Sequence, residues 1–317
     1  IIYIISSMLS TNNKISYLES CKICGNKKLK KVLKLNEQYI SATFVKSNVE
    51  NDLKKIKTHL NLSLCVQDGN LSNCGHLQLN EIINSDVLYR NYFYRSSTND
   101  TMKKDLKNVV DRVLEIAKPD PHDIVVDIGS NDCTLLNYYQ KELKLVGFEP
   151  AKNIKFIDEG KNIKIFSSYF NAQNFIENFG EKAKIITSCA MFYDLENPKK
   201  FVQDIKNIMD KNGIWCVQIS YLLLMIKNLN FYDICHEHLS YYSIDSFEKL
   251  IEQFDLKIFY AETNAVNGGS IRFYVCKKEC KKYDKENFQT KLKKLRIEEE
   301  KYHLNNENTF FIFQKKI

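Results

Sequence analysis

The sequence predicts an α/β protein whose main unit is a Rossmann-like, doubly wound sheet, preceded by a small cysteine-bearing unit. Three observations support this. From residue 123 onward, short apolar runs alternate with helical segments, a glycine turn follows the first of these runs, and four of the ten cysteines form two spaced pairs nearer the start. A chain of 317 residues is long enough for one full core and a smaller satellite domain.

The amino-acid composition limits which binding partners and which cellular compartment we expect. The net charge of +7 comes mostly from scattered lysines, and no arginine-rich or aromatic-interleaved stripe indicates a nucleic-acid surface. No apolar stretch is long enough for a membrane span, so we expect no membrane partner. Ten cysteines without a secretory signal favour reduced thiols in a cytoplasmic protein. The oligomeric state is left open.

The cysteine pairs of the first unit have the spacing of metal-binding knuckles. Each pair ends in Cys-Gly, and together they supply Cys21, Cys24, Cys65 and Cys74. Four thiolates are the tetrahedral set that closes a structural Zn2+ site and leaves no open position. The second pair is wider than usual, so a three-cysteine site completed by His76 or His59 is a variant, and four unrelated buried thiols are the plain alternative.

The main unit opens with a predicted strand, turn and helix. The apolar run 123–128 indicates a buried parallel strand, Gly129 gives the tight turn, and we expect a helix after it that presents its amino terminus. A second strand over 143–148 ends in Glu149, where a carboxylate can accept both ribose hydroxyls of an adenosine.

Further alternation completes the predicted sheet. We expect a helix over 197–209 and strands over 184–189, 213–219, 256–262 and 270–276. The pattern ends in a hairpin, and a right-handed doubly wound sheet follows from it.

The composition of the first turn indicates the ligand. A dinucleotide site needs three glycines to admit a pyrophosphate, whereas this turn has one and continues with an amide and an acid. An anionic turn repels phosphate and suits a ligand with a cationic amino-acid end, a description that S-adenosylmethionine fits. The candidate cofactor-binding residues are Asp127, Gly129, Asn131, Asp132 and Glu149.

Two histidines bracket a glutamate late in the chain. Only six histidines occur in the whole sequence, and His236 and His238 flank Glu237. This places groups that titrate or polarise near neutral pH in one short segment, which favours proton-transfer chemistry. A metal-ligand pair and two solvated loop histidines are the alternatives.

These motifs, in this order, resemble the sugar C-methyltransferases, bacterial enzymes with a zinc-binding amino-terminal domain, a class I methyltransferase core and a carboxy-terminal domain. The resemblance covers residues 21–273. Besides the knuckles, it includes the aromatic segment 88–97, the turn 127–132, and the segments 147–151, 236–238 and 267–270. Each motif alone is weak, whereas several in the family's order are specific.

The resemblance implies methyl transfer from S-adenosylmethionine to a ring carbon of a nucleotide-linked deoxy-keto-sugar. It implies His238 as the base, with His236 and Glu237 as its partners and Tyr92 or Tyr94 near the sugar. A C–H bond beside a ketone is acidic enough to break, and a tyrosine hydroxyl can donate to the resulting enolate oxygen. For the two tyrosines, packing at the domain junction is an equal alternative.

The resemblance also divides the chain. We expect a poorly defined N-terminus over 1–14, a zinc-binding domain over 15–95, a methyltransferase domain over 96–280, and a helical remnant over 281–317 that leads to a missing carboxy-terminal domain. A truncated homologue that binds zinc and cofactor without turnover is therefore a second interpretation, and an O-methyltransferase is a third.

Two residues depart from the family pattern. Cys133 stands where the family usually has glycine in the turn. Asp194 stands near a position where some relatives have histidine, so any role of that histidine is not carried over.

Overall fold

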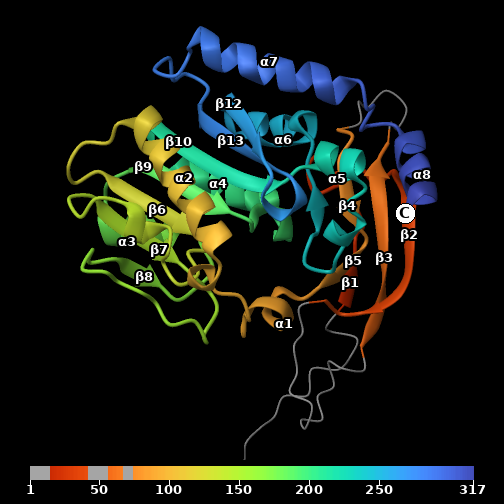
Figure 1. The fold of residues 1–317 in the computed structure, drawn as a ribbon, viewed down its shortest axis with the longest axis horizontal. Coiled ribbons are helices and arrows are strands. Elements are labelled where there is room, and N and C mark those ends of the chain that lie inside the picture. Colours follow the sequence, from red (N-terminus) through yellow and green to blue (C-terminus); the bar gives the residue numbers. More distant parts are fainter. Residues whose placement is uncertain (1–14, 42–55, 67–73) are drawn as a thin grey trace, which may run out of the picture.

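The computed structural model describes residues 15–41, 56–66 and 74–317, so the expected N-terminal segment 1–14 lies outside the described residues. A seven-stranded sheet and a four-stranded sheet lie beside each other (Figure 1). A third, two-stranded sheet pairs β1 (Ile15–Tyr17) with β5 (Glu81–Ile83). No helix in these three ranges is long and apolar enough to cross a membrane.

The seven-stranded sheet is the predicted Rossmann-like sheet. Its order is β12-β13-β10-β9-β6-β7-β8, in which the strands from β10 to β8 run parallel and β13 is antiparallel to both of its neighbours. The strands are β6 (Ile124–Ile128), β7 (Lys144–Phe148), β8 (Lys164–Phe166), β9 (Ala183–Cys189), β10 (Met209–Ser220), β12 (Leu256–Asn264) and β13 (Ser270–Lys277). The predicted α/β class and closing hairpin are confirmed, and the short β8 was not foreseen.

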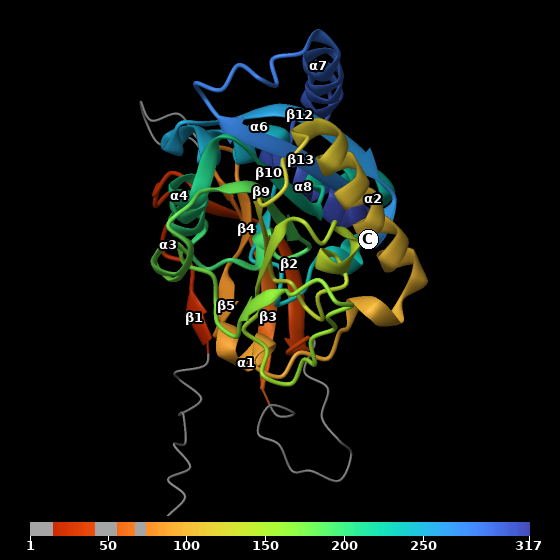
Figure 2. The same cartoon turned by 90° about the vertical axis from the view of Figure 1, so that its left-hand side faces the viewer.

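Helices cover both faces of this sheet (Figure 2). On one face lies α2 (Asp100–Ala117), whose Val109 and Val113 join the same hydrophobic cluster as Val125 of β6. The other face is covered by α3 (Ala172–Phe179), α4 (Pro198–Ile208) and α6 (Ile244–Ile251). Asn197 caps α4 by accepting a hydrogen bond from the backbone N–H of Lys200, which explains why this helix begins where the sequence predicted.

The helix expected directly after Gly129 is absent from the described chain. This prediction was wrong, because Asn131 and Cys133 adopt left-handed backbone conformations, with φ of 50° and 69°, that interrupt a right-handed helix. The segment forms a turn and a short 3-10 helix, η4 (Leu136–Tyr138). The left-handed conformation of Cys133 is one that glycine adopts at no steric cost.

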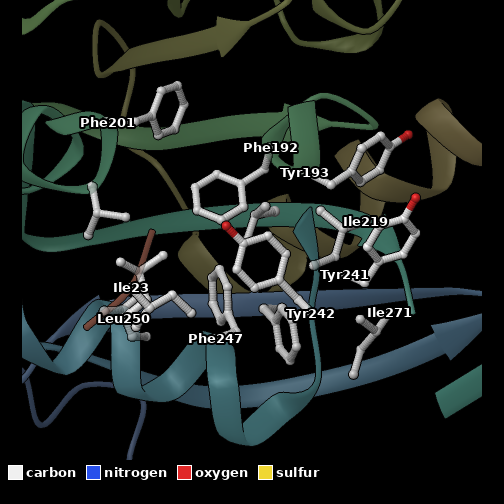
Figure 3. Close-up of a cluster of buried hydrophobic side chains, with 14 of the residues drawn as sticks. Ile23, Phe192, Tyr193, Phe201, Ile219, Tyr241, Tyr242, Phe247, Leu250 and Ile271 are labelled. Atoms are coloured by element: carbon white, nitrogen blue, oxygen red, sulfur yellow. The ribbon is translucent and has the colours of Figure 1, made fainter. Parts of the chain in front are cut away.

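The four-stranded sheet carries the cysteine pairs. β2 (Leu29–Tyr39), β3 (Lys57–Cys65) and β4 (Leu77–Leu79) form an antiparallel meander, and β11 (Ser240–Tyr241) adds to β4. The fourth strand thus comes from the segment directly after His238. One hydrophobic cluster runs through both sheets, and Figure 3 shows Ile23 of the cysteine-bearing unit beside Leu250 of α6. The two units therefore share a core.

Two helices close the chain. α7 (Glu286–Glu300) runs along β12 at the edge of the large sheet, and α8 (Glu307–Lys316) lies against β2 of the small one (Figure 1). The side-chain amide of Gln314 donates to the carbonyl of Lys34 at 3.0 Å. The expected helical segment is present, and its last helix packs on the cysteine-bearing sheet.

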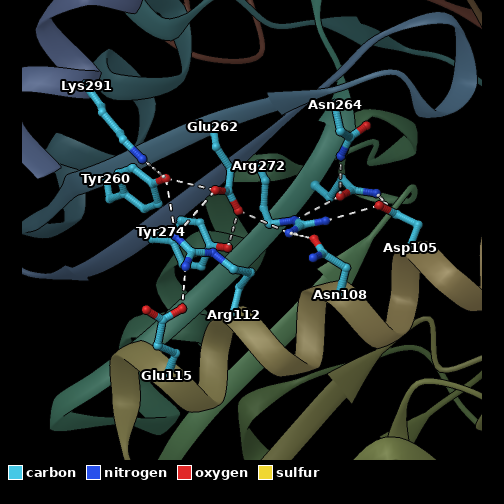
Figure 4. Close-up of polar contacts among 11 residues, drawn as sticks. Asp105, Asn108, Arg112, Glu115, Tyr260, Glu262, Asn264, Arg272, Tyr274 and Lys291 are labelled. Atoms are coloured by element: carbon cyan, nitrogen blue, oxygen red, sulfur yellow. Dashed lines mark hydrogen bonds and ion pairs between the residues drawn. The ribbon is translucent and has the colours of Figure 1, made fainter.

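A buried cation ties α2 to the hairpin of β12 and β13 (Figure 4). Arg272 of β13 is 1% exposed, and its guanidinium pairs with Asp105 of α2 and Glu262 of β12, each at 3.1 Å. Its Nε donates to Gln218 of β10 at 3.0 Å. The charge is thus matched by two carboxylates and an amide, the arrangement that a buried ion needs.

The remaining short elements connect the strands and longer helices. They are α1 (Ser85–Tyr89), α5 (Leu222–Asn228), and the 3-10 helices η3 (Ser96–Thr98), η5 (Phe192–Asp194), η6 (Phe231–Asp233), η7 (Glu252–Phe254) and η8 (Val266–Gly268).

Candidate functional site

The site lies where the parallel strands end. In such sheets, ligands bind at the carboxyl ends of the strands, where β6 is followed by Gly129, β7 by Glu149 and β9 by η5. Gly129 has φ +73°, and a Cβ added there would lie 3.2 Å from Cγ of Met191, the residue before η5. The first turn and η5 are therefore in contact, and a side chain at Gly129 would be strained.

Glu149 is the centre of the predicted cofactor site. Its Oε2 accepts the backbone N–H of Asn131 at 2.9 Å and its Oε1 that of Ala151 at 2.8 Å. Each oxygen keeps a lone pair that a ribose hydroxyl could use. Burial raises the pKa of Glu149, against the effect of these two hydrogen bonds and of Arg95.

Asp127 supplies a second acid beside the turn. Its Oδ1 accepts the hydroxyl of Thr187 at 2.6 Å, and burial raises its pKa to about 7. Asp127 and Glu149 interact electrostatically, as do Glu149 and Asp132, so the predicted residues lie together. Acidic groups around this turn fit the cationic amino-acid end of S-adenosylmethionine, and Glu149 fits its ribose.

Asn131 and Asp132 have a further role that the sequence did not indicate. The side-chain oxygen of Asn131 accepts the backbone N–H of Ser96 at 3.0 Å, and a carboxylate oxygen of Asp132 accepts that of Ser97 at 2.9 Å. Asn131 also donates to the carbonyl of Tyr94 at 3.2 Å. The cofactor turn thus holds the aromatic segment against itself.

The two candidate tyrosines occupy different parts of this segment. Tyr94 lies near Asp132, and its hydroxyl is buried without a hydrogen-bond partner among the residues described. Burial raises the pKa of Tyr92, and Glu237, Asp194 and Glu149 raise it further. Tyr92 is therefore within electrostatic range of both the cofactor side and the His-Glu-His segment.

His238 is held as a neutral base. Its Nδ1 lies 2.7 Å from the carbonyl oxygen of Asp233, and because a carbonyl can only accept, Nδ1 carries the proton. Burial lowers the pKa of His238 to about 4. The ring packs on Tyr193 of η5 at 4.3 Å between centroids. The lone pair of Nε2 is consequently available at neutral pH.

Acidic and phenolic groups surround this base. Burial raises the pKa of Glu237 to about 7 and that of Asp194 well above its usual value, and Glu237 contributes to the shift of Asp194. The hydroxyl of Tyr89 donates to the backbone oxygen of Glu237 at 3.4 Å and interacts electrostatically with the Asp194 carboxyl. Glu237, η5 and α1 therefore lie close together.

His236 points away from this group. Its Nδ1 accepts the backbone N–H of Ser41 at 3.2 Å, and the backbone N–H of His236 donates to the hydroxyl of Ser41 at 2.9 Å. Its imidazole also lies near Glu81 and is fully buried. The structure thus brings His238 and Glu237 to the site and sends His236 into the cysteine-bearing unit.

The four predicted cysteines form one cluster. The Sγ atoms of Cys21, Cys24, Cys65 and Cys74 all lie within 4.8 Å of one another. Sulfurs around a Zn2+ ion at about 2.3 Å stand roughly 3.8 Å apart, so this set fits a tetrahedral ion. Nε2 of His76 instead lies 3.2 Å from Ser240, and His59 is exposed, so neither variant ligand joins the cluster.

Comparisons with known proteins agree with this division. The family described as "Methyltransferase domain" matches residues 99–261. The chain belongs to this methyltransferase family. Residues 21–89 match the family described as "Putative zinc binding domain". With the sheet order above, this gives a class I S-adenosylmethionine-dependent methyltransferase fold.

Similar proteins were found in sequence and in structure. The C-methyltransferase NovU of Streptomyces niveus is 27% identical over 206 residues, which make up 62% of this chain and 48% of NovU. This chain therefore spans about half the length of that curated relative. An S-adenosylmethionine-dependent methyltransferase of Clostridium acetobutylicum has a TM-score of 0.44 at 13% identity, covering 55% of this chain and 91% of its own. Magnesium protoporphyrin IX methyltransferase of Synechocystis, with bound SAH, has a TM-score of 0.43 at 11% identity and covers 56% and 88%.

Sequence reasoning missed the residues that η5 and α1 bring to the site. Tyr193 and Asp194 follow β9, and Tyr89 ends α1 near the start of the aromatic segment. The position of η5 directly after a parallel strand is the signal that could have found the first two, since such positions line the ligand edge.

Proposed function

We propose that the chain is a C-methyltransferase that acts on a nucleotide-linked deoxy-keto-sugar. The observation that carries the proposal is the state of His238, whose Nδ1 is committed to the Asp233 carbonyl while Nε2 has no hydrogen-bond partner among the residues described. Similarity to a C-methyltransferase supports the same reaction class. Zn2+ held by the four cysteines would have a structural role.

The residues of the site suit proton removal beside a ketone. Nε2 of His238 would take the proton from the sugar carbon, and the electron pair would move toward the ketone oxygen as an enolate. The Asp233 carbonyl stabilises the resulting imidazolium by accepting from Nδ1, and Tyr193 fixes the ring. When bound, S-adenosylmethionine supplies an electrophilic methyl group for the carbanionic carbon.

Cofactor binding would depend on the first turn. Glu149 and Asp127 would hold the ribose and the cationic end of S-adenosylmethionine, while Asn131 and Asp132 hold the aromatic segment over the turn. Tyr92 links the two halves, since it is within range of Glu149 and of Glu237.

The deciding experiment combines exchange and methylation. The purified chain is incubated with a panel of nucleoside-diphosphate-linked deoxy-keto-sugars, first in deuterated water without cofactor and then with methyl-labelled S-adenosylmethionine. Exchange of the hydrogen beside the ketone, followed by NMR detection of a new carbon–carbon bond, is the expected result. A methyl group found on oxygen, without prior exchange, would instead identify an O-methyltransferase.

His238→Ala should lower turnover by about a hundredfold to ten-thousandfold, the usual worth of general base catalysis, with cofactor affinity changed only a few-fold. His59→Ala, an exposed histidine of β3, is the matched control and should behave as the unmodified chain. If exchange persisted in His238→Ala while methylation stopped, His238 would be a positioning residue and Glu237 would be the base.

A second candidate function is binding without catalysis. In that case the chain binds Zn2+ and cofactor without turnover. Calorimetry would then show binding of S-adenosylmethionine, whereas neither exchange nor methylation would occur with any sugar of the panel.

A further inference from the structure

Arg95 joins two segments that meet beside the predicted cofactor site. It belongs to the aromatic segment 88–97, and its Nη1 donates to the backbone carbonyls of Tyr92 and Tyr94, each at 2.7 Å. Its Nη2 donates to the backbone carbonyl of Asn153 at 2.9 Å, in the loop that follows β7 and 58 residues further along the chain. One half-buried guanidinium therefore holds three carbonyl oxygens that come from two distant segments.

Further hydrogen bonds surround this contact. The side-chain amide of Asn153 donates to the carbonyl of Tyr92 at 3.0 Å, and the backbone N–H of Lys152 donates to the carbonyl of Arg90 at 3.1 Å. The same aromatic segment is also hydrogen-bonded to the first turn, through the backbone N–H groups of Ser96 and Ser97. The segment is thus fixed between the loops that follow β6 and β7.

Glu149 lies where these two loops meet. Its carboxylate accepts a backbone N–H from each of them, that of Asn131 after β6 and that of Ala151 after β7. Burial raises the pKa of Glu149, while the two backbone hydrogen bonds and the positive charge of Arg95 oppose this effect. Other titratable groups that interact with Glu149 carry no positive charge, and they are Asp127, Asp132, Cys133 and Tyr92.

We propose that Arg95 is a positioning residue of the cofactor site, which holds the aromatic segment and the loop after β7 together so that Glu149 and Tyr92 keep one geometry. This rests on the proposed role of Glu149 in holding the ribose of S-adenosylmethionine. A guanidinium suits the task because its planar fork presents several N–H donors in a fixed arrangement, whereas the ammonium of lysine is a compact point charge. Arg95 therefore acts through the backbone of both segments.

Calorimetry of Arg95→Gln and Arg95→Lys separates the fork from the charge. In both variants the Kd of S-adenosylmethionine should rise about tenfold, because the two segments must then be ordered on binding. Loss of the cation in Arg95→Gln raises the pKa of Glu149, so affinity should begin to fall at a higher pH than in the unmodified chain. Arg95→Lys keeps the charge and should keep that pH.

The matched control is Arg90→Gln. Arg90 is an exposed arginine of the same segment, and its side chain pairs with Asp86 of α1. This variant should bind S-adenosylmethionine as the unmodified chain does, at every pH.

Backbone hydrogen exchange tests the contact without any ligand. The N–H groups of Ser96, Ser97 and Lys152 are each hydrogen-bonded across the junction, so they should exchange about tenfold faster in both Arg95 variants. Those of β9 and β10 should keep their normal rates in the same samples, which shows that the variants are folded. Arg90→Gln should show neither change.

Several outcomes would overturn the positioning role. Unchanged affinity in Arg95→Gln, with or without faster exchange, would leave Arg95 without influence on the site, and normal affinity in Arg95→Lys would mean that charge alone matters. An equal response in Arg90→Gln would also contradict it. If the unmodified chain did not bind S-adenosylmethionine, the cofactor site and this role would fail together. Weaker binding in Glu149→Gln, beside unaffected Arg95 variants, would overturn the role of Arg95 alone.

Discussion

The hydroxyl of Ser240 lies 3.2 Å from Nε2 of His76, and this contact joins the cysteine cluster to the base loop. His76 follows Cys74 by two residues, and Ser240 follows His238 by two. The same two segments pair as strands β4 and β11, with Ser240 opposite Gln78. The small sheet is therefore part of the support for His238, which explains why the two units share a core.

Ser240→Ala should destabilise the fold at this junction. His76 is fully buried, and removal of the hydroxyl leaves its Nε2 without a partner, which costs about 1–3 kcal/mol of the free energy of unfolding. Urea denaturation measures the change. Ser167→Ala, at an exposed serine, should change stability by less than about 0.5 kcal/mol, and an equal loss in both variants would contradict the assigned contact.

Metal analysis should find one Zn2+ per chain, lost in Cys24→Ser. Cys24 is exposed, so this change removes a ligand without opening the core. Structural Zn2+ contributes about 10–16 kcal/mol of apparent binding free energy in small zinc domains, so backbone hydrogen exchange should accelerate in β2, β3 and β4. Cys189→Ser, outside the cluster, should keep its zinc. Unchanged zinc content in Cys24→Ser would rule out the proposed ligand set.

Glu149→Gln should weaken binding of S-adenosylmethionine. The change removes the charge and turns one acceptor into a donor that faces a backbone N–H, with an expected cost on the order of 2 kcal/mol, or roughly thirtyfold in Kd. Because burial raises the pKa of Glu149, cofactor affinity should also fall as the pH drops and the carboxylate is protonated. Calorimetry at several pH values measures both effects, and unaltered binding in Glu149→Gln would place the ribose elsewhere.

Arg272→Met should cost about 3–5 kcal/mol of unfolding free energy, because it leaves Asp105 and Glu262 without their buried cation. Lys107→Met breaks an exposed pair with Asp111 on the same helix and should cost at most about 1 kcal/mol. Denaturant titration of the two variants checks the difference. Similar losses in both would mean that the network of Figure 4 is not a major support of α2.

Local patterns predicted much of the large sheet and the metal cluster. Apolar runs fix strands such as β6 and β10, and the two Cys-Gly pairs identify the four thiols that meet. The elements that were not predicted depend on contacts between segments that are distant in the sequence. The two-residue strand β11 is too short to show a period, and it forms only because β4 offers an open edge.

The candidate site was predicted only in part, again because it depends on contacts between distant segments. The spacing of His236 and His238 could not show that one side chain turns toward Ser41 while the other faces Tyr193, since that depends on how the loop passes between the two sheets. The helix predicted after Gly129 failed because a left-handed backbone at Asn131 and Cys133 is unusual for these residues and has no reliable sequence signal.

The packing of Tyr193 on His238 predicts how the reaction responds to pH. Burial lowers the pKa of His238 to about 4, so the base loses function only as the pH falls through that value. Tyr193→Ala would admit water beside the imidazole and move its pKa toward the ordinary value of about 6.5. The acidic limb, in which the rate of substrate hydrogen exchange falls as the pH drops, would therefore shift to higher pH. Tyr193→Phe keeps the ring and should leave the limb in place. The lowered pKa also means that the unfolded chain binds this proton first, so folding stability is lost as the pH falls from about 6.5 toward 4. If Tyr193→Ala and Tyr193→Phe had the same acidic limb, burial by this ring would not be what keeps His238 neutral.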